Sequence, residues 1–182
     1  MRIMGIDPGL QRTGYGVIDQ IDTRRYRLVE GGVVGTESDW LLEQRLSAIL
    51  EGIAEIIAEF QPDIAVVEKL YSKYRHPRTA ILMGHARGAI YLAAARHSLP
   101  ITAYPASQIK KSLTGNGRAT KGQVAAMVTQ LLGLDETPGP ADVTDALALA
   151  ICHARPGPQQ GGHRELPDAV REALAREGRT VR

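Results

Sequence analysis

The spacing of apolar and polar residues divides the chain into strand-like and helix-like stretches. Residues 2–19 read as two strands around the turn Pro8-Gly9, and residues 26–34 as a third, which predicts an antiparallel meander. Residues 41–60 instead repeat apolar side chains every three or four positions, the period of an amphipathic helix. Residues 63–68, Asp-Ile-Ala-Val-Val-Glu, form a short continuous apolar run, which is typical of a central parallel strand.

The second half of the chain predicts four helices and one more strand. Helices are expected at 79–97, from Pro105 onward, at 121–132 and from Pro140 to about residue 152, and a brief strand at 101–104. Thr120-Lys-Gly-Gln123 matches a capping box, and Pro140 suits a first helical position. The last helix is apolar on all sides from Ala146 onward, so it should be buried. The pattern predicts an α/β fold with a mixed five-stranded sheet, three strands as an antiparallel meander plus parallel strands, flanked by helices.

The composition changes after Arg155-Pro-Gly-Pro158, where Gln, Gly and Pro become frequent. We therefore expect one domain over residues 1–155 and a flexible tail over 156–182, with at most a short helix at 167–176. No apolar run approaches the roughly 18 residues of a membrane span, and Asp7 interrupts any signal-peptide pattern, so the expected location is cytoplasmic. A single cysteine, Cys152, excludes an intramolecular disulfide and a thiolate-rich metal site.

Positive charge is concentrated in the middle of the chain. Residues 69–134 contain 10 basic and no acidic residues, whereas residues 1–68 contain 12 acidic and 6 basic ones. Such a block predicts a polyanionic partner, most simply nucleic acid, although charge runs also occur as plain solvated surface. Residues 69–78 interleave two tyrosines with basic residues, as in surfaces that stack bases and bind phosphates, and Tyr71 has the alternative role of anchoring this loop on the core.

Four acidic residues stand at the ends of predicted elements. Asp7 ends the first strand, Glu68 ends the apolar strand, and Asp142 and Asp145 lie at the start of the buried helix. Asp7-Pro-Gly also fits a simple turn, and the helix dipole alone would stabilise Asp142. If the four converge, their mutual repulsion, about 4 kcal/mol per pair at 4 Å and a dielectric of 20, calls for a counter-charge. All-oxygen ligands favour Mg²⁺ or Mn²⁺ over Zn²⁺, and two such ions would support phosphodiester hydrolysis.

These stretches, taken in order, resemble the RuvC family of Holliday junction endonucleases. The resemblance covers about residues 1–155 and rests on Gly5-Ile-Asp-Pro-Gly9 with Thr13-Gly-Tyr-Gly16, Glu68, Gly84-His-Ala-Arg-Gly88 and Ala141-Asp-Val-Thr-Asp-Ala-Leu-Ala148. It implies a ribonuclease H-like fold, a homodimer, Mg²⁺-dependent paired nicks in a four-way DNA junction, and partnership with the RuvA and RuvB branch-migration proteins.

The resemblance also implies roles for individual residues. The metal-binding catalytic acids would be Asp7, Glu68, Asp142 and Asp145. Tyr71 would enter the junction, and Lys110 and Lys121 would contact phosphates. Lys121 lies in the first turn of a helix, where a cation opposes the dipole, so it is either a phosphate ligand or a solvated side chain. The full set of candidate DNA-binding residues is Tyr71, Lys73, Arg75, Arg78, Lys110, Lys111, Arg118 and Lys121.

Other assignments compete with this one. A kinase or ATPase of the same broad fold would share the Asp7 turn, but it should have a second glycine-rich phosphate loop and a longer chain. A module that binds junctions without cutting them would not need four acids. A ribonuclease H-like enzyme acting on RNA, or the other bacterial resolvase of this fold, fits the same residues. Gly84 and Gly88 make helix 79–97 the candidate surface for close approach of another helix, within the fold or from a second subunit.

Overall fold

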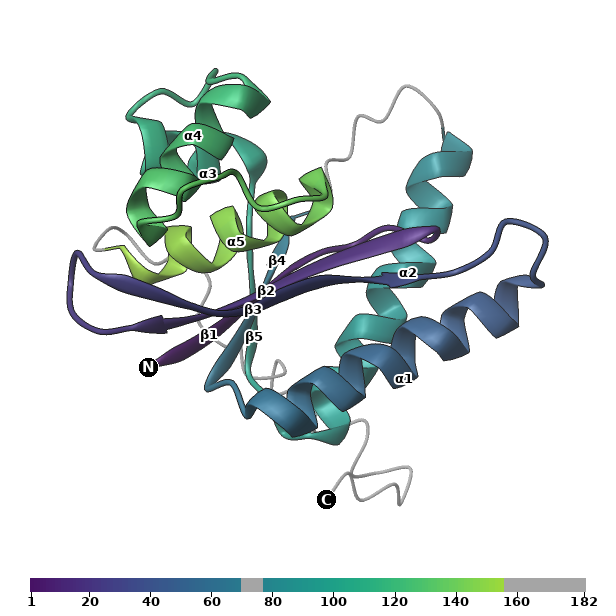
Figure 1. The fold of residues 1–182 in the computed structure, drawn as a ribbon. Helices are drawn as coiled ribbons and strands as arrows, with labels where there is room; N and C mark the ends of the chain where they lie inside the picture. The colour runs from purple at the N-terminus through teal and green to yellow at the C-terminus, as the bar shows by residue number, and fades with distance from the viewer. Residues whose placement is uncertain (70–76, 156–182) are drawn as a thin grey trace, which may run out of the picture.

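The computed structural model describes residues 1–69 and 77–155, for Pro77 and Arg78 the backbone alone. A five-stranded sheet in the order β3-β2-β1-β4-β5 forms the centre of the molecule (Figure 1). Its strands are β1 (Arg2–Asp7), β2 (Arg12–Gln20), β3 (Tyr26–Gly35), β4 (Ile64–Glu68) and β5 (Ile101–Tyr104). The first three strands pair antiparallel, and β4 is parallel to both β1 and β5. The predicted mixed five-stranded sheet is confirmed.

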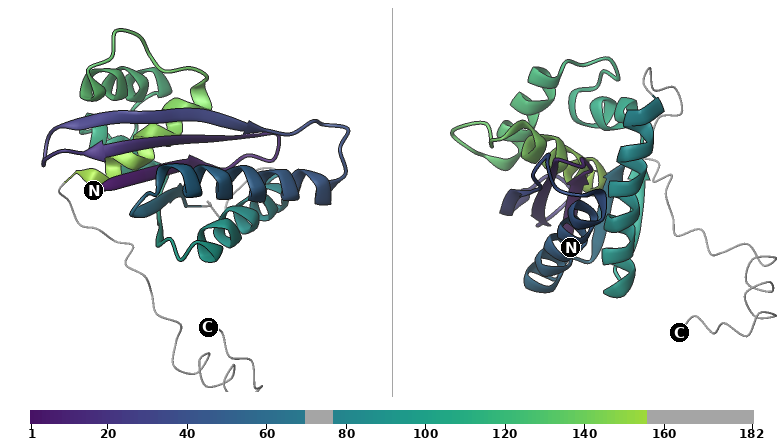
Figure 2. Two further views of the ribbon diagram at one scale, coloured as in Figure 1. Left: turned by 60° about the horizontal axis from the view of Figure 1, so that its bottom comes forward. Right: turned by 90° about the vertical axis from the view of Figure 1, so that its right-hand side faces the viewer.

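Helices cover both faces of the sheet, as Figures 1 and 2 show. One face packs against α1 (Leu42–Phe60) and α2 (Pro77–Arg96), and the other against α3 (Ala106–Thr114), α4 (Lys121–Leu132) and α5 (Ala141–Ala154). The two cores follow strand alternation, since neighbouring β1 residues contribute to opposite faces. Ile3 is fully buried on the α5 side, and Met4 on the α1 side.

Helix α5 lies directly on the backbone of the central strands. A Cβ atom added to Gly5 would stand 1.8 Å from the carbonyl oxygen of Ala146, and one added to Gly14 would stand 2.8 Å from the Cβ atom of Asp142. Side chains at these two positions would therefore push the helix away from the sheet. This close approach explains why the helix is buried after its first turns, as its apolar sequence predicts.

Most predicted boundaries agree with the structure to within two residues. Helix α2 begins at Pro77 and ends at Arg96 rather than spanning 79–97, and Pro140 immediately precedes α5 instead of occupying its first turn. The Thr120 capping box is present, because the Thr120 hydroxyl accepts from the Gln123 backbone N–H and the Gln123 side chain accepts from the Thr120 N–H. Within the described ranges, no helix combines the length and the apolarity needed to cross a membrane. The predicted tail, residues 156–182, lies outside the described residues.

Candidate active site

The four candidate acids come from three elements that meet at one end of the sheet. Asp7 and Glu68 end the parallel neighbours β1 and β4, one residue beyond the pair formed by Ile6 and Val67. Asp142 and Asp145 belong to the first turns of α5, and the backbone of Asp142 contacts Gly14, the β2 partner of Asp7. Sheet register and helix packing therefore direct these acids toward one region, the carboxyl end of parallel strands where α/β folds place ligand sites.

Hydrogen bonds fix the turn that follows Asp7. The buried Thr13 hydroxyl donates to the Gly9 carbonyl at 2.7 Å, and the Thr36 hydroxyl donates to the Leu10 carbonyl at 2.7 Å. The Thr36 N–H also donates to the Gln11 carbonyl at 3.0 Å, which ties the turn to the end of β3. These hydrogen bonds hold the turn after β1 in place, and with it the position of Asp7 at the end of the strand.

The acids act on one another electrostatically. The pKa of Asp7 is raised from 3.8 to about 7, first because the carboxyl is buried and then because Asp145 and Glu68 are close, while Lys121 partly offsets the rise. Burial and the charge of Asp145 also raise the pKa of Glu68, against opposing effects of Lys121, Arg87 and Lys110. The cluster is short of positive charge at neutral pH, which favours binding of a cation.

Two of the acids are paired with basic side chains from other elements. Lys121 Nζ, at the start of α4, donates to Asp145 Oδ2 at 2.6 Å, and this contact raises the pKa of Lys121. Arg12 Nε, at the start of β2, donates to Asp142 Oδ2 at 3.0 Å. Lys121 is therefore not a free solvated lysine, and its pairing with an acid of the site explains a cation in the first turn of a helix. Its role as a phosphate ligand stays a prediction.

The four acids have the ligand atoms that a divalent ion prefers, but their side chains are not arranged as a complete metal-binding site. Among the described residues, no three His, Cys, Asp or Glu side chains are grouped closely enough to hold one metal ion. The four carboxylates offer only oxygen ligands, and the charges of Asp145 and Glu68 add to burial in raising the pKa of Asp7. Asp7, Glu68, Asp142 and Asp145 therefore fit Mg²⁺ or Mn²⁺ once Asp142 and Asp145 leave their basic partners.

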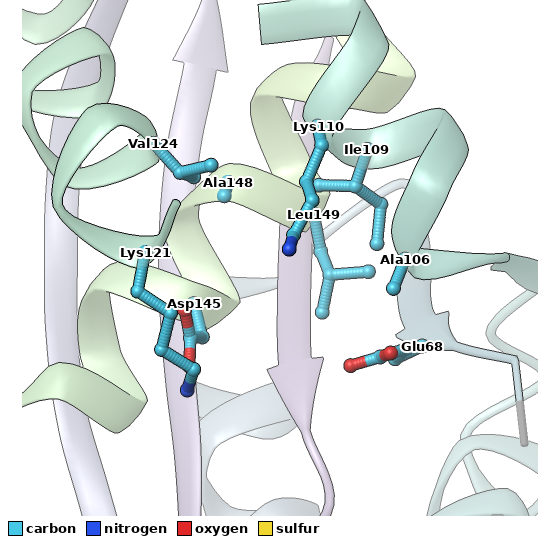
Figure 3. A pocket seen from close by; sticks show the side chains of 9 residues that line it. All are labelled: Glu68, Ala106, Ile109, Lys110, Lys121, Val124, Asp145, Ala148 and Leu149. Atoms are coloured by element: carbon cyan, nitrogen blue, oxygen red, sulfur yellow. The ribbon is translucent and has the colours of Figure 1, made fainter. Parts of the chain in front are cut away.

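A cavity of about 190 Å³ is lined by two of the acids, Glu68 and Asp145, and by two lysines, Lys110 and Lys121. Figure 3 shows Lys121 and Asp145 on one side of it, Glu68 on the opposite side, and Lys110 reaching in from α3. Its remaining lining is apolar and comes from α3, α4 and α5: Ala106, Ile109, Val124, Ala148 and Leu149. A site with carboxylates facing two lysines suits a metal ion next to an anionic group such as a phosphate.

Comparison with known proteins shows the family of this chain. The family model for crossover junction endodeoxyribonuclease RuvC matches residues 3–153, which is most of the chain. The chain belongs to the RuvC family. A RuvC from Bordetella avium is 48% identical over 160 residues, covering 88% of this chain and 87% of that one, and a RuvC from Desulforamulus reducens is 46% identical over 162 residues, covering 89% and 98%.

Solved structures place the fold in the same family. Thermus thermophilus RuvC in complex with Holliday junction substrate superposes with a TM-score of 0.81 at 38% identity, covering 85% of this chain and 93% of that one. A yeast mitochondrial Holliday junction resolvase, Ydc2, has a TM-score of 0.58 at 12% identity, covering 84% and 78%, and so supports the fold alone. The prediction of a RuvC family member is confirmed.

The other predicted DNA-binding residues of this RuvC-family chain are placed less centrally. Lys111 on α3 and Arg118 in the turn before α4 are exposed and are not part of the cavity lining. Tyr71, Lys73 and Arg75 lie outside the described residues, as does the side chain of Arg78.

Two arginines near the site, Arg12 and Arg87, were not among the residues predicted from the sequence. Arg12 lies in the acid-rich first third of the chain and so was not counted with the basic segment. Arg87, inside the glycine-rich motif of α2, donates to the backbone carbonyl of Glu68, and its guanidinium lies 5.4 Å from the ring centre of Tyr91. Arg87 thus braces the end of β4 from the opposite face of the sheet, a contact that its sequence neighbours do not reveal.

Proposed function

We propose that this protein is a Holliday junction endonuclease, which resolves four-way DNA junctions by paired, symmetric, divalent-metal-dependent phosphodiester hydrolysis during homologous recombination and DNA repair. The convergence of Asp7, Glu68, Asp142 and Asp145 at one end of the sheet carries the proposal. RuvC family membership and similarity to a relative solved with Holliday junction substrate support it.

The four acids would hold two Mg²⁺ ions, with Mn²⁺ as a substitute. When bound, such ions activate a water and stabilise the leaving oxygen of the phosphodiester. The chain's own contribution is to fix the ligands: the braced turn positions Asp7, Arg87 holds the end of β4 behind Glu68, and α5 presents its acids beside them. Burial of Asp7 and Glu68 reduces competition from water for these carboxylates.

Basic residues around the cavity would seat the DNA. Lys110 and Lys121 line a cavity together with Glu68 and Asp145, so we assign the two lysines to the phosphate beside the reacting bond. Tyr71 is proposed to enter the junction by stacking on a base. The remaining cations would follow the DNA backbone away from the site: Lys73, Arg75, Arg78, Lys111 and Arg118.

Helix α2 is the proposed surface of a homodimer. Cβ atoms added to Gly84 or Gly88 would meet no atom within 4 Å, so no described part of the chain occupies that space. Ile81 and Leu92 are exposed on the same helix, at 60% and 49%. A two-fold protein matches a two-fold junction, and small residues flanked by exposed apolar ones suit close packing of a second copy.

A Gly88→Leu variant tests this surface. It should sediment as a monomer, because the added side chain would stand between the two helices. Ala58→Leu adds similar bulk to the exposed face of α1 and should remain dimeric. A Gly88→Leu protein that stays dimeric would show that the interface lies elsewhere.

The cellular setting follows from the family resemblance. We propose that the enzyme acts with the RuvA and RuvB branch-migration proteins in the cytoplasm, on junctions in chromosomal DNA. The proposed nuclease unit spans residues 1–155, and the family match over residues 3–153 supports this extent.

Substrate comparison tests the proposed activity. Four-way junction, linear duplex and RNA–DNA hybrid are each incubated with the protein in Mg²⁺, Mn²⁺ or EDTA. We expect symmetric nicks in the junction alone, and only with a divalent ion. Preferred cutting of the hybrid would instead assign a ribonuclease H activity, and junction binding without cutting in every metal would assign a binding module.

A further inference from the structure

Arg12 occupies a defined place beside the active site. It is the first residue of β2 and lies on the same face of the strand as Gly14 and Gly16, the face that packs against α5. Because those glycines have no side chains, α5 approaches closely enough for Arg12 Nε to reach Asp142 Oδ2 at 3.0 Å. The contact joins residues 130 positions apart in sequence and depends on the same packing that positions the acids.

The ion pair uses a carboxylate that the metal site needs. Asp142 Oδ2 accepts from Arg12 and is therefore not available as an unhindered metal ligand. The same holds on α5 one turn later, where Asp145 Oδ2 is taken by Lys121. By contrast, the side chains of Asp7 and Glu68 form no ion pair with any of the described residues.

Arg12 is also suited to bind something other than Asp142. Its side chain is 52% exposed, and only one of the five N–H groups of its guanidinium is used in the pair with Asp142. Guanidinium binds phosphate oxygens readily, whereas a divalent ion repels it. A metal ion at Asp142 would therefore release Arg12 next to a site that receives DNA.

We propose that Arg12 is an exchangeable counter-ion of the active site: it neutralises Asp142 in the metal-free protein and becomes a DNA phosphate contact when a divalent ion takes Asp142. This inference rests on the proposed function. Metal binding then frees Arg12 for the DNA, and DNA binding frees Asp142 for the metal, so each event strengthens the other. Such coupling is reciprocal. The order of binding does not alter this thermodynamic link.

The first test measures Mn²⁺ binding without DNA, by electron paramagnetic resonance at fixed ionic strength. Arg12→Gln should bind Mn²⁺ about two- to fivefold more tightly than the wild type, the scale of an exposed ion pair. Arg25→Gln is the matched control, because Arg25 is also exposed and also pairs through Nε, with Asp22 at 2.5 Å, beyond the far end of β2. It removes the same charge and should leave Mn²⁺ affinity unchanged.

The second test separates exchange from a general charge effect. Junction affinity is measured against salt concentration in EDTA and in Ca²⁺, with a denaturing gel to verify that the junction stays intact. In Ca²⁺ the salt dependence of Arg12→Gln should fall by about one phosphate contact, a slope change of about 0.9, while in EDTA it should equal the wild type. Arg25→Gln should match the wild type in both.

Specific results would overturn the proposal. An equal loss of slope with and without metal would make Arg12 a permanent DNA contact, and no loss in either would exclude it from the DNA surface. An unchanged Mn²⁺ affinity in Arg12→Gln would show that the pair with Asp142 does not compete with metal. If the wild type itself bound no Mn²⁺, with or without junction, the proposed metal site would fail, and the exchange with it.

Discussion

Replacing Asp7 by asparagine should abolish cleavage and yet stabilise the metal-free protein at alkaline pH. Burial and neighbouring carboxylates raise the pKa of Asp7 from 3.8 to about 7. A carboxyl whose folded-state pKa is raised favours the folded state fully only below its unfolded pKa, and this contribution is lost as the pH rises through the folded value. Asparagine resembles the protonated acid and does not ionise, so the variant escapes that loss.

The size of the effect follows from the two pKa values. Between them, each pH unit removes about 1.4 kcal/mol from the free energy of unfolding. From about pH 5 to about pH 8, the wild type should therefore lose about 2 to 3 kcal/mol through this group. The stability of Asp7→Asn relative to the wild type should rise by the same amount over that range.

Urea unfolding followed by circular dichroism in EDTA measures this difference. Glu55→Gln, on the exposed face of α1, is the control for loss of one negative charge and should show no such pH dependence relative to the wild type. Added Mg²⁺ should restore wild-type stability at high pH and have less effect on Asp7→Asn, because a ligand that binds the folded state stabilises it. A stability difference that stays constant with pH would refute the placement of Asp7 in a buried acidic cluster.

Two further predictions concern contacts outside the candidate active site. Asp19→Asn should lower the free energy of unfolding by about 1 kcal/mol at neutral pH, the scale of an ion pair screened by water. Hydrogen bonds from Arg2 and Arg27 lower the pKa of Asp19 to about 2, but Arg27 is largely exposed, which limits the effect. Urea unfolding should show the wild-type advantage above about pH 4 and its loss as the pH falls through about 2. Tyr104→Phe should lower the free energy of unfolding by about 1 to 2 kcal/mol, because it removes the hydroxyl that lies 2.9 Å from the buried His153 Nδ1. An unchanged urea unfolding midpoint would show that His153 finds another hydrogen-bond partner.

Local sequence patterns were sufficient for the elements, and they also marked the acids that we propose for the site. Asp7 and Glu68 stand where a strand pattern ends, before Pro8-Gly9 and after an apolar run, and Asp142 and Asp145 stand where a buried helix begins, so element boundaries mark these residues. Parallel strands align their carboxyl ends, which is why two acids far apart in sequence could be expected together. The structure bears out this part of the fold.

Contacts between distant elements were beyond the reach of those patterns. The partner of Asp142 is Arg12, and that of Asp145 is Lys121, and both pairs depend on how α5 sits on the sheet and against α4. That placement depends in turn on Gly14, whose missing side chain acquires meaning only once β2 and α5 are seen in contact. A sequence without its fold does not show which cation faces which acid.

An Asp145→Asn variant tests whether the acid cluster is a metal-dependent nuclease site. Wild type and variant are compared for cleavage of a synthetic four-way junction in Mg²⁺, with junction binding followed by gel shift. We expect the wild type to make symmetric nicks and the variant to bind the junction without cutting it. If Asp145→Asn cuts at the wild-type rate, or if neither protein cuts while both bind, the assignment of a nuclease site to these acids is contradicted.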